Sequence, residues 1–263
     1  MLLALAACGT PRPLADPPLP QPSTQTSDTE PPAAANATAR APVPAESAPA
    51  PPAVEAFPGV RLHVGERWIE FDGIVPIDVR ERDRTGFVLI RYLEAVAVTP
   101  ASGKDHEALV LTSARPAHVH AALLALGLEP GTPGRVAWDG RFAITSAADG
   151  PRVAVTLRPS EAPPPGEPIE QFITHADDAT PFRPGGGDPR WVFAGSLLQD
   201  DDTRYVADAT GLLVGLHTFG SEVVALTTTL SPDSWIDEPE WIAHPERTPQ
   251  FGASVTIRLA VDQ

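Results

Sequence analysis

Alternating apolar and polar residues run through most of the chain and predict strands. The stretches 60–64 and 67–73 both alternate in this way, and a short glycine-containing link joins them. Two period-two runs joined by such a link predict a β-hairpin. Apolar runs predict further strands at 86–98 (one bent strand or two), 107–112, 152–157, 190–195, 203–208, 212–218, 222–228 and 253–261.

One stretch, 115–127, has the spacing of a helix instead. Pro116 suits a first helical turn, Ser113 is placed to cap it, and Gly127 suits the exit. Apolar residues recur at i, i+3, i+4 and i+7, which predicts one core-facing stripe of Val119, Ala122, Leu123 and Leu126. The rest of this helix is also largely apolar, so we expect it to be covered on two sides.

Together these elements predict one β-rich α+β domain over 58–263. We expect mostly antiparallel sheets and one prominent helix at about 115–127. The Pro/Gly-rich stretches 158–168 and 180–189 interrupt the pattern and predict surface loops within the same domain.

A different composition marks residues 9–57. This stretch holds 13 of the 32 prolines and very few large apolar residues. It cannot bury enough apolar surface to offset the entropy lost on ordering, which predicts a disordered Pro/Ala-rich linker.

The only cysteine, Cys8, closes the opening stretch MLLALAAC. A single cysteine excludes an internal disulfide and any four-cysteine metal site within one chain. The run Leu-Ala-Ala-Cys resembles the lipobox of bacterial lipoproteins, which implies cleavage before Cys8 and acylation of this residue. Residues 1–8 are therefore predicted to be the remnant of a signal peptide with its lipobox. The expected location is the bacterial cell envelope, lipid-anchored at the outer membrane or facing the periplasm.

Charge narrows the range of partners. The chain carries a net charge of −15, of which the linker contributes −3, so the predicted domain carries −15 + 3 = −12. Such a surface repels nucleic acid phosphates and anionic lipid headgroups, and no nucleic-acid partner is expected. The expected partners are the membrane, through Cys8, and an unidentified envelope protein or small ligand.

Candidate chemistry centres on the stretch GKDHEALV, where Lys104, His106 and Glu107 enter a predicted strand just before the helix. His106, Glu107 and His120 form a credible ligand set for a divalent metal such as zinc, although Lys104 would oppose a cation. His118 would point away from His120, because residues two apart on a helix lie on opposite sides. In the alternative interpretations these residues stabilise the turn or line a binding groove, with no cofactor.

From Trp68 onward, over most of 60–261, the chain resembles the YdjY-domain proteins, a family of largely uncharacterised bacterial envelope proteins. The likeness is carried by the segments WIEFDG (68–73), LEAVAV (93–98), KDHEALV (104–110), 114–133, WVFAGS (191–196) and YVAD (205–208) with Gly211. The resemblance implies a YdjY-like domain but no particular activity.

Three hypotheses follow for function. The first is a membrane-anchored lipoprotein whose domain binds a partner or ligand without catalysis. The second is a metal-dependent envelope enzyme that uses His106, Glu107 and His120. The third is a structural scaffold of the envelope.

Overall fold

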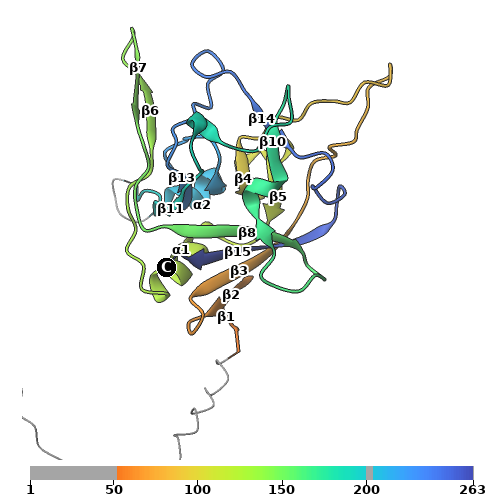
Figure 1. Cartoon of the computed structure of the whole chain (residues 1–263). Coiled ribbons are helices and arrows are strands. Elements are labelled where there is room, and N and C mark those ends of the chain that lie inside the picture. The colour runs from red at the N-terminus through yellow and green to blue at the C-terminus, as the bar shows by residue number, and fades with distance from the viewer. Residues whose placement is uncertain (1–51, 200–203, 263) are drawn as a thin grey trace, which may run out of the picture. The chain divides into compact units, whose positions relative to one another are not determined.

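The computed structural model describes residues 52–199 and 204–262. Cys8 and the predicted linker up to residue 51 lie outside the described residues. Within them the prediction of a β-rich α+β fold with mostly antiparallel pairing and one main helix is confirmed (Figure 1).

One large sheet organises the domain. It has 11 strands, in the order β11-β13-β12-β4-β5-β3-β15-β8-β9, with β2 beside β3 and β1 beside β2. Among the strands that the structure describes, only the pairs β4–β5 and β12–β13 are parallel. The strands are β1 (Val54–Phe57), β2 (Val60–His63), β3 (Trp68–Ile74), β4 (Ala95–Val98), β5 (Ala108–Thr112), β8 (Val153–Pro159), β9 (Glu167–Pro168), β11 (Trp191–Phe193), β12 (Leu212–Gly215), β13 (Val224–Leu226) and β15 (Ser254–Val261).

Two short antiparallel pairs and several helical turns complete the fold. The pairs are β6 (Arg135–Trp138) with β7 (Ala143–Ser146), and β10 (Ile173–His175) with β14 (Trp241–Ala243). The α-helices are α1 (Pro116–Ala125) and α2 (Val206–Thr210), and the 3-10 helices are η1 (Pro100–Ser102), η2 (Asp105–Glu107), η3 (Ile169–Phe172) and η4 (Pro184–Gly186).

The predicted hairpin is present as β2 and β3, and its alternation separates two faces of the sheet. Ile69 and Phe71 are fully buried in the hydrophobic core. Glu70, between them, points the other way because side chains alternate along a strand. There the Arg258 Nε donates to the Glu70 Oε1 at 2.9 Å, and the Arg258 guanidinium lies 3.9 Å from the centre of the Trp68 ring. This polar face is thus held by a carboxylate with guanidinium partners.

The helix α1 buries the predicted stripe, with Val119, Ala122 and Leu123 fully buried. The predicted cap is wrong, because the N-cap position is Arg115 and no side chain local to the helix caps it. Instead Asp208, from α2, accepts a hydrogen bond from the Ala117 amide at 2.9 Å. A carboxylate at a helix start also interacts favourably with the helix dipole, so α2 stabilises α1 from 91 residues away.

Other boundaries also differ from the prediction. Val54–Phe57, assigned to the linker, forms β1 against β2, and the Phe57 ring stacks on that of His118 at 5.6 Å. The folded domain therefore begins before residue 58. The predicted strand 203–208 is wrong, because Val206–Thr210 is helical and ends at Gly211, whose left-handed backbone suits a helix exit.

Only Ala95–Val98 of the predicted strand 86–98 is a strand of the sheet. Residues 86–92 belong to a projecting loop, 79–92, in which Arg82 and Val88 form an isolated bridge. The short strands β1, β6, β7, β9, β10 and β14 were not predicted. Each has two to four residues, too few for a period of two to stand out.

Candidate functional site

The predicted polar stretch is assembled around Lys104, between η1 and η2. Its Nζ donates to the Glu107 Oε2 at 3.1 Å and also bonds the Glu94 carboxylate. Glu94 and Glu107 come together because each directly precedes a strand, and those strands, β4 and β5, are parallel neighbours with Ala95 opposite Ala108. We call Glu94, Lys104 and Glu107 the Lys104 cluster.

Burial and charge shift the pKa values of the two carboxyl groups of this cluster in opposite directions. Burial raises the pKa of Glu94, and the bond to Lys104 only partly offsets this. Burial also acts to raise the pKa of Glu107, but the bond to Lys104, the charge of Lys104 and the neighbouring Glu94 and His106 together outweigh it, so that the pKa is lowered. The pKa of Lys104 is raised, because its bonds to both carboxylates outweigh its burial. Glu94 therefore keeps its proton to higher pH than Glu107.

A buried polar loop, residues 216–222, lies against the cluster. The ring of Phe219 has its centre 5.2 Å from the Lys104 Nζ. Glu222 is fully buried, and its carboxylate accepts hydrogen bonds from the amides of Phe219 and Gly220. Burial raises the pKa of Glu222, and these amides act against the rise. A Cβ at Gly215 would overlap the Glu222 side chain, so this glycine makes room for the carboxylate.

His217 is the second buried ionisable group of this loop, with 7 % of its surface exposed. Its backbone amide donates to the Glu94 carbonyl at 2.8 Å, which fixes the loop beside the cluster. Within the described residues its Nδ1 has no hydrogen-bond partner. Burial lowers the pKa of His217 to about 4, so the imidazole is neutral at neutral pH.

His106 faces outward from the cluster. Its side chain is 63 % exposed, and its Nε2 lies 3.6 Å from the Glu107 Oε1. His106 also lines an open pocket of about 370 Å³ with Pro76, Ile77, Asp78, Glu81, Arg91 and Phe251. Among the predicted residues only His106 lines this pocket. Glu107 neighbours His106 and bonds Lys104, whereas His120 lies elsewhere.

His120 lies in a different environment on α1. Its Nδ1 is 2.8 Å from the Tyr205 hydroxyl and 3.0 Å from the Gly195 carbonyl oxygen, and its ring packs edge-on against Phe193. Burial lowers the pKa of His120. These contacts connect α1 to the chain around β11 and α2, which indicates a structural role.

The predicted metal ligands are consequently not assembled. Among residues 52–199 and 204–262 no group of three or more His, Cys, Asp or Glu side chains is arranged to hold a metal ion. Lys104 occupies the position between Glu94 and Glu107 that a cation would otherwise take.

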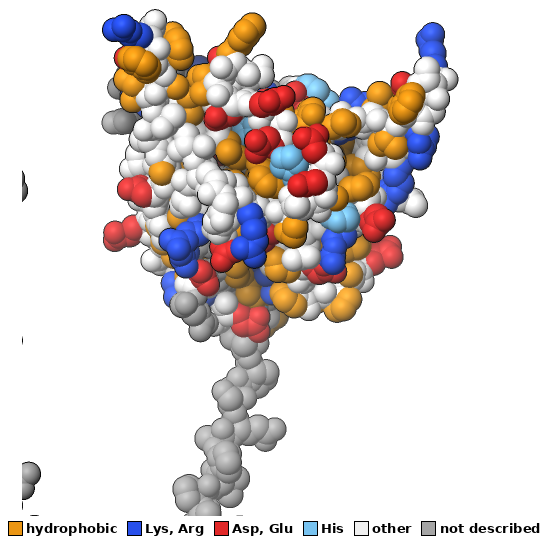
Figure 2. Space-filling view, turned by 45° about the horizontal axis from the view of Figure 1, so that its top comes forward, with side chains coloured by type: hydrophobic (Ala, Val, Ile, Leu, Met, Phe, Trp, Pro, Cys, Tyr) orange, Lys and Arg blue, Asp and Glu red, His pale blue; other side chains and the backbone are white. Residues whose placement is uncertain are grey.

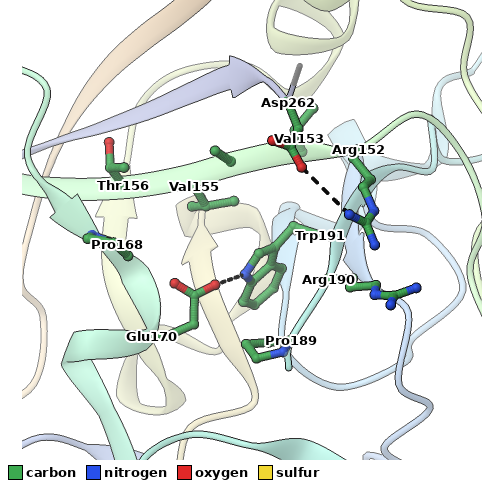
Figure 3. Close-up of a pocket in the computed structure, with 11 residues that line it drawn as sticks. Arg152, Val153, Val155, Thr156, Pro168, Glu170, Pro189, Arg190, Trp191 and Asp262 are labelled. Carbon is green, nitrogen blue, oxygen red and sulfur yellow. Dashed lines mark hydrogen bonds and ion pairs between the residues drawn. The ribbon is translucent and has the colours of Figure 1, made fainter. Parts of the chain in front are cut away.

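A second pocket, of about 180 Å³, opens between β8 and β11 (Figure 3). Figure 3 shows the Trp191 indole aimed at Glu170, with a hydrogen bond of 2.7 Å from its Nε1 to the Oε1. Arg152 lies 3.9 Å from the Asp262 carboxylate at the rim. Small-molecule sites measure roughly 300–1,000 Å³, so of these two the pocket beside His106, of about 370 Å³, is the better candidate.

The sequence missed several members of this region. Glu94 is part of the segment LEAVAV, but its pairing with Lys104 depends on the neighbouring parallel strands. In the sequence, His217 and Glu222 are flanked by apolar residues whose pattern predicts strands. The one local indication was the pair of glycines, Gly215 and Gly220, in an otherwise strand-like stretch.

The sequence that forms this fold matches one recognised domain family. The family model of the YdjY domain matches residues 72–260. The chain therefore belongs to the YdjY domain family, as its sequence segments indicated. No curated protein and no solved structure is significantly similar to it.

Proposed function

We propose that this chain is a lipid-anchored protein of the bacterial cell envelope whose YdjY domain binds a small amphipathic ligand without catalysing a reaction. The lipobox-like run ending at Cys8 and the Pro/Ala-rich linker after it support the anchoring. Within the described residues no helix is long and apolar enough to cross a bilayer.

The pocket beside His106 is the observation that carries the binding proposal. Pro76, Ile77 and Phe251 provide apolar surface. Asp78 and His106 provide polar groups at the same opening, together with an ion pair of 2.6 Å between Arg91 and Glu81. An apolar lining with a few placed polar groups is typical of small-molecule sites, and it suits a ligand with one apolar and one charged end.

The Lys104 cluster supports binding over catalysis. The Lys104 ammonium is held by Glu94 and Glu107, and its pKa is raised. An amine acts as a nucleophile only when deprotonated, so a raised pKa works against that role. We infer that the cluster is a rigid wall behind His106.

Anchoring is tested by the chemistry of Cys8 in the native host. Mass spectrometry of the N-terminal peptide should find a diacylglyceryl group on Cys8, and the protein should remain with membranes after a high-salt wash. The variant Cys8→Ser should be released by that wash. An unmodified thiol in a cytosolic fraction would refute the anchoring.

Ligand binding is tested by saturation-transfer NMR with two probes, indole-3-acetate as an aromatic anion and phenethylamine as an aromatic cation. At least one should receive saturation from the wild-type protein, and Phe251→Ala should weaken this. Phe142→Ala is the matched control, because Phe142 and Phe251 are 63 % and 65 % exposed and only Phe251 lines the pocket. Equal effects of both variants, or no transfer to either probe, would count against the pocket.

A further inference from the structure

Two arms project from the body of the domain. One is the loop 79–92 and the other is the β6–β7 hairpin, residues 135–146. Both extend from the same side of the domain, at the end away from β1 (Figures 1 and 2). Short-range contacts hold their shape, because β6 pairs with β7 and the Asp83 carboxylate accepts hydrogen bonds from the amides of Thr85 and Phe87.

The arms present apolar side chains to solvent. In the described part of the chain they hold seven of the fifteen exposed large hydrophobic residues, namely Phe87, Val88, Ile90, Tyr92, Trp138, Phe142 and Ile144. Phe87 is 74 % exposed, and Trp138 is 62 % exposed. Such clustering on two short segments indicates a surface that contacts something else.

The same arms are positively charged on an acidic protein. Residues 79–92 carry four arginines against Glu81 and Asp83, a balance of +2, and 135–146 carry two arginines against Asp139, a balance of +1. The chain as a whole has −15, so the remainder has −15 − 3 = −18. Figure 2 shows basic and apolar side chains at both arms, and acidic side chains and histidines on the face between them.

We propose that the two arms dock the domain onto an anionic phospholipid surface. Arginines attract anionic headgroups, and aromatic rings lie favourably at the boundary between headgroups and acyl chains. The Arg141 guanidinium lies 5.6 Å from the Phe142 ring centre, so one tip already pairs a cation with an aromatic group.

The arrangement of charge favours a lipid surface over an acidic protein. A bilayer is a continuous anionic plane that two separate tips reach at the same time. The acidic face between the arms is repelled by the same plane, which leaves the arms as the contact points. The net charge of the sequence predicted repulsion from anionic lipid, and the fold reverses this by placing the positive segments outermost.

The test uses the full-length chain carrying Cys8→Ser, so that no acyl chain contributes. Binding is measured by co-sedimentation with vesicles of phosphatidylglycerol and, separately, of phosphatidylcholine at low salt. We expect the protein to bind phosphatidylglycerol vesicles at least roughly tenfold more tightly, with affinity falling as salt rises. Failure here would leave the acylation of Cys8 and the pocket beside His106 unaffected.

Two double variants locate the contact: Phe87→Ala with Ile90→Ala, and Trp138→Ala with Phe142→Ala. Each should weaken binding to phosphatidylglycerol vesicles by roughly tenfold, because it removes inserted apolar area. Val64→Ala is the control, since Val64 is 59 % exposed in the β2–β3 turn and should not change binding. Thermal unfolding checks that each variant is folded.

Two outcomes would overturn the proposal. One is that the wild-type arms do not bind phosphatidylglycerol vesicles, or bind both lipids equally. The other is that the double variants bind as tightly as the Val64→Ala control. A photo-crosslinker at position 87 that captures an envelope protein, while vesicle binding is absent, would assign the arms to a protein partner instead.

Discussion

The buried imidazole of His217 predicts that this domain loses stability in acid. Its pKa is lowered from 6.5 to about 4 by burial, which Lys104 reinforces and which Asp237 and Glu107 partly oppose. In the unfolded chain His217 takes up a proton near its ordinary pKa, whereas in the folded chain it takes up the proton only at lower pH. The stabilising contribution is therefore fully present above pH 6.5 and is lost as pH falls through 4.

The magnitude follows from the difference between the two pKa values. The free-energy difference is about 1.4 kcal/mol for each pH unit. Because the pKa falls from 6.5 to about 4, the free energy of unfolding drops by roughly 3 kcal/mol at a pH below the folded-state pKa. At about pH 5 the drop is roughly 2 kcal/mol. Domains of ordinary stability unfold with about 5–15 kcal/mol, so this single group is a large fraction of the total.

The assay is urea denaturation at about pH 7 and about pH 5, followed by tryptophan fluorescence. In His217→Gln, which cannot titrate, the drop in unfolding free energy between the two pH values should be smaller than in the wild type by roughly 2 kcal/mol. His106→Gln is the matched control, because the His106 side chain is 63 % exposed. A His217→Gln variant that loses as much stability as the wild type would refute the reasoning.

Three further substitutions test the packing, each read as a shift in the urea midpoint. Asp208→Ala removes the acceptor for the Ala117 amide and should cost about 1 kcal/mol, whereas Asp208→Asn should cost less; equal losses would argue against capping. Gly195→Ala should destabilise by at least about 2 kcal/mol, because its Cβ would overlap a proline ring. Gly140→Ala, also at positive φ but in open space, should cost only about 1 kcal/mol. Similar losses in both variants would show that backbone strain alone sets the cost. Glu70→Gln leaves buried guanidinium groups uncompensated and should cost about 3–5 kcal/mol; a neutral effect would mean that water already screens them.

The helix and the long strands were accessible from the sequence because their pattern is local. The stripe of Val119, Ala122 and Leu123 fixes which side of α1 is buried, and the same stripe is buried in the fold. The hairpin of β2 and β3 likewise follows from alternation and a short link. Short strands such as β10 and β14 were not predicted, since a strand of three residues shows almost no period. These two strands acquire their structure by pairing with each other.

The candidate site was accessible only in part. Lys104, His106 and Glu107 were singled out because they are adjacent in sequence, and they lie together in the fold. His120 was added to them on the same reasoning of closeness in the chain, but the helix directs its ring toward Tyr205. Sequence distance is a poor guide to contact between a turn and a helix that faces another element.

The sequence by itself determined the fold class, the main helix and membership of the YdjY domain family, because each is encoded in local periodicity and short segments. The tertiary structure decided which distant groups meet. Glu94 reaches Lys104 through the parallel pairing of β4 and β5, and Asp208 caps a helix that begins 92 residues before it. The fold also buried His217 and placed the arginine-rich arms outermost. A hydrophobic pattern shows how apolar a segment is, but burial depends on the neighbours that only the packed chain supplies.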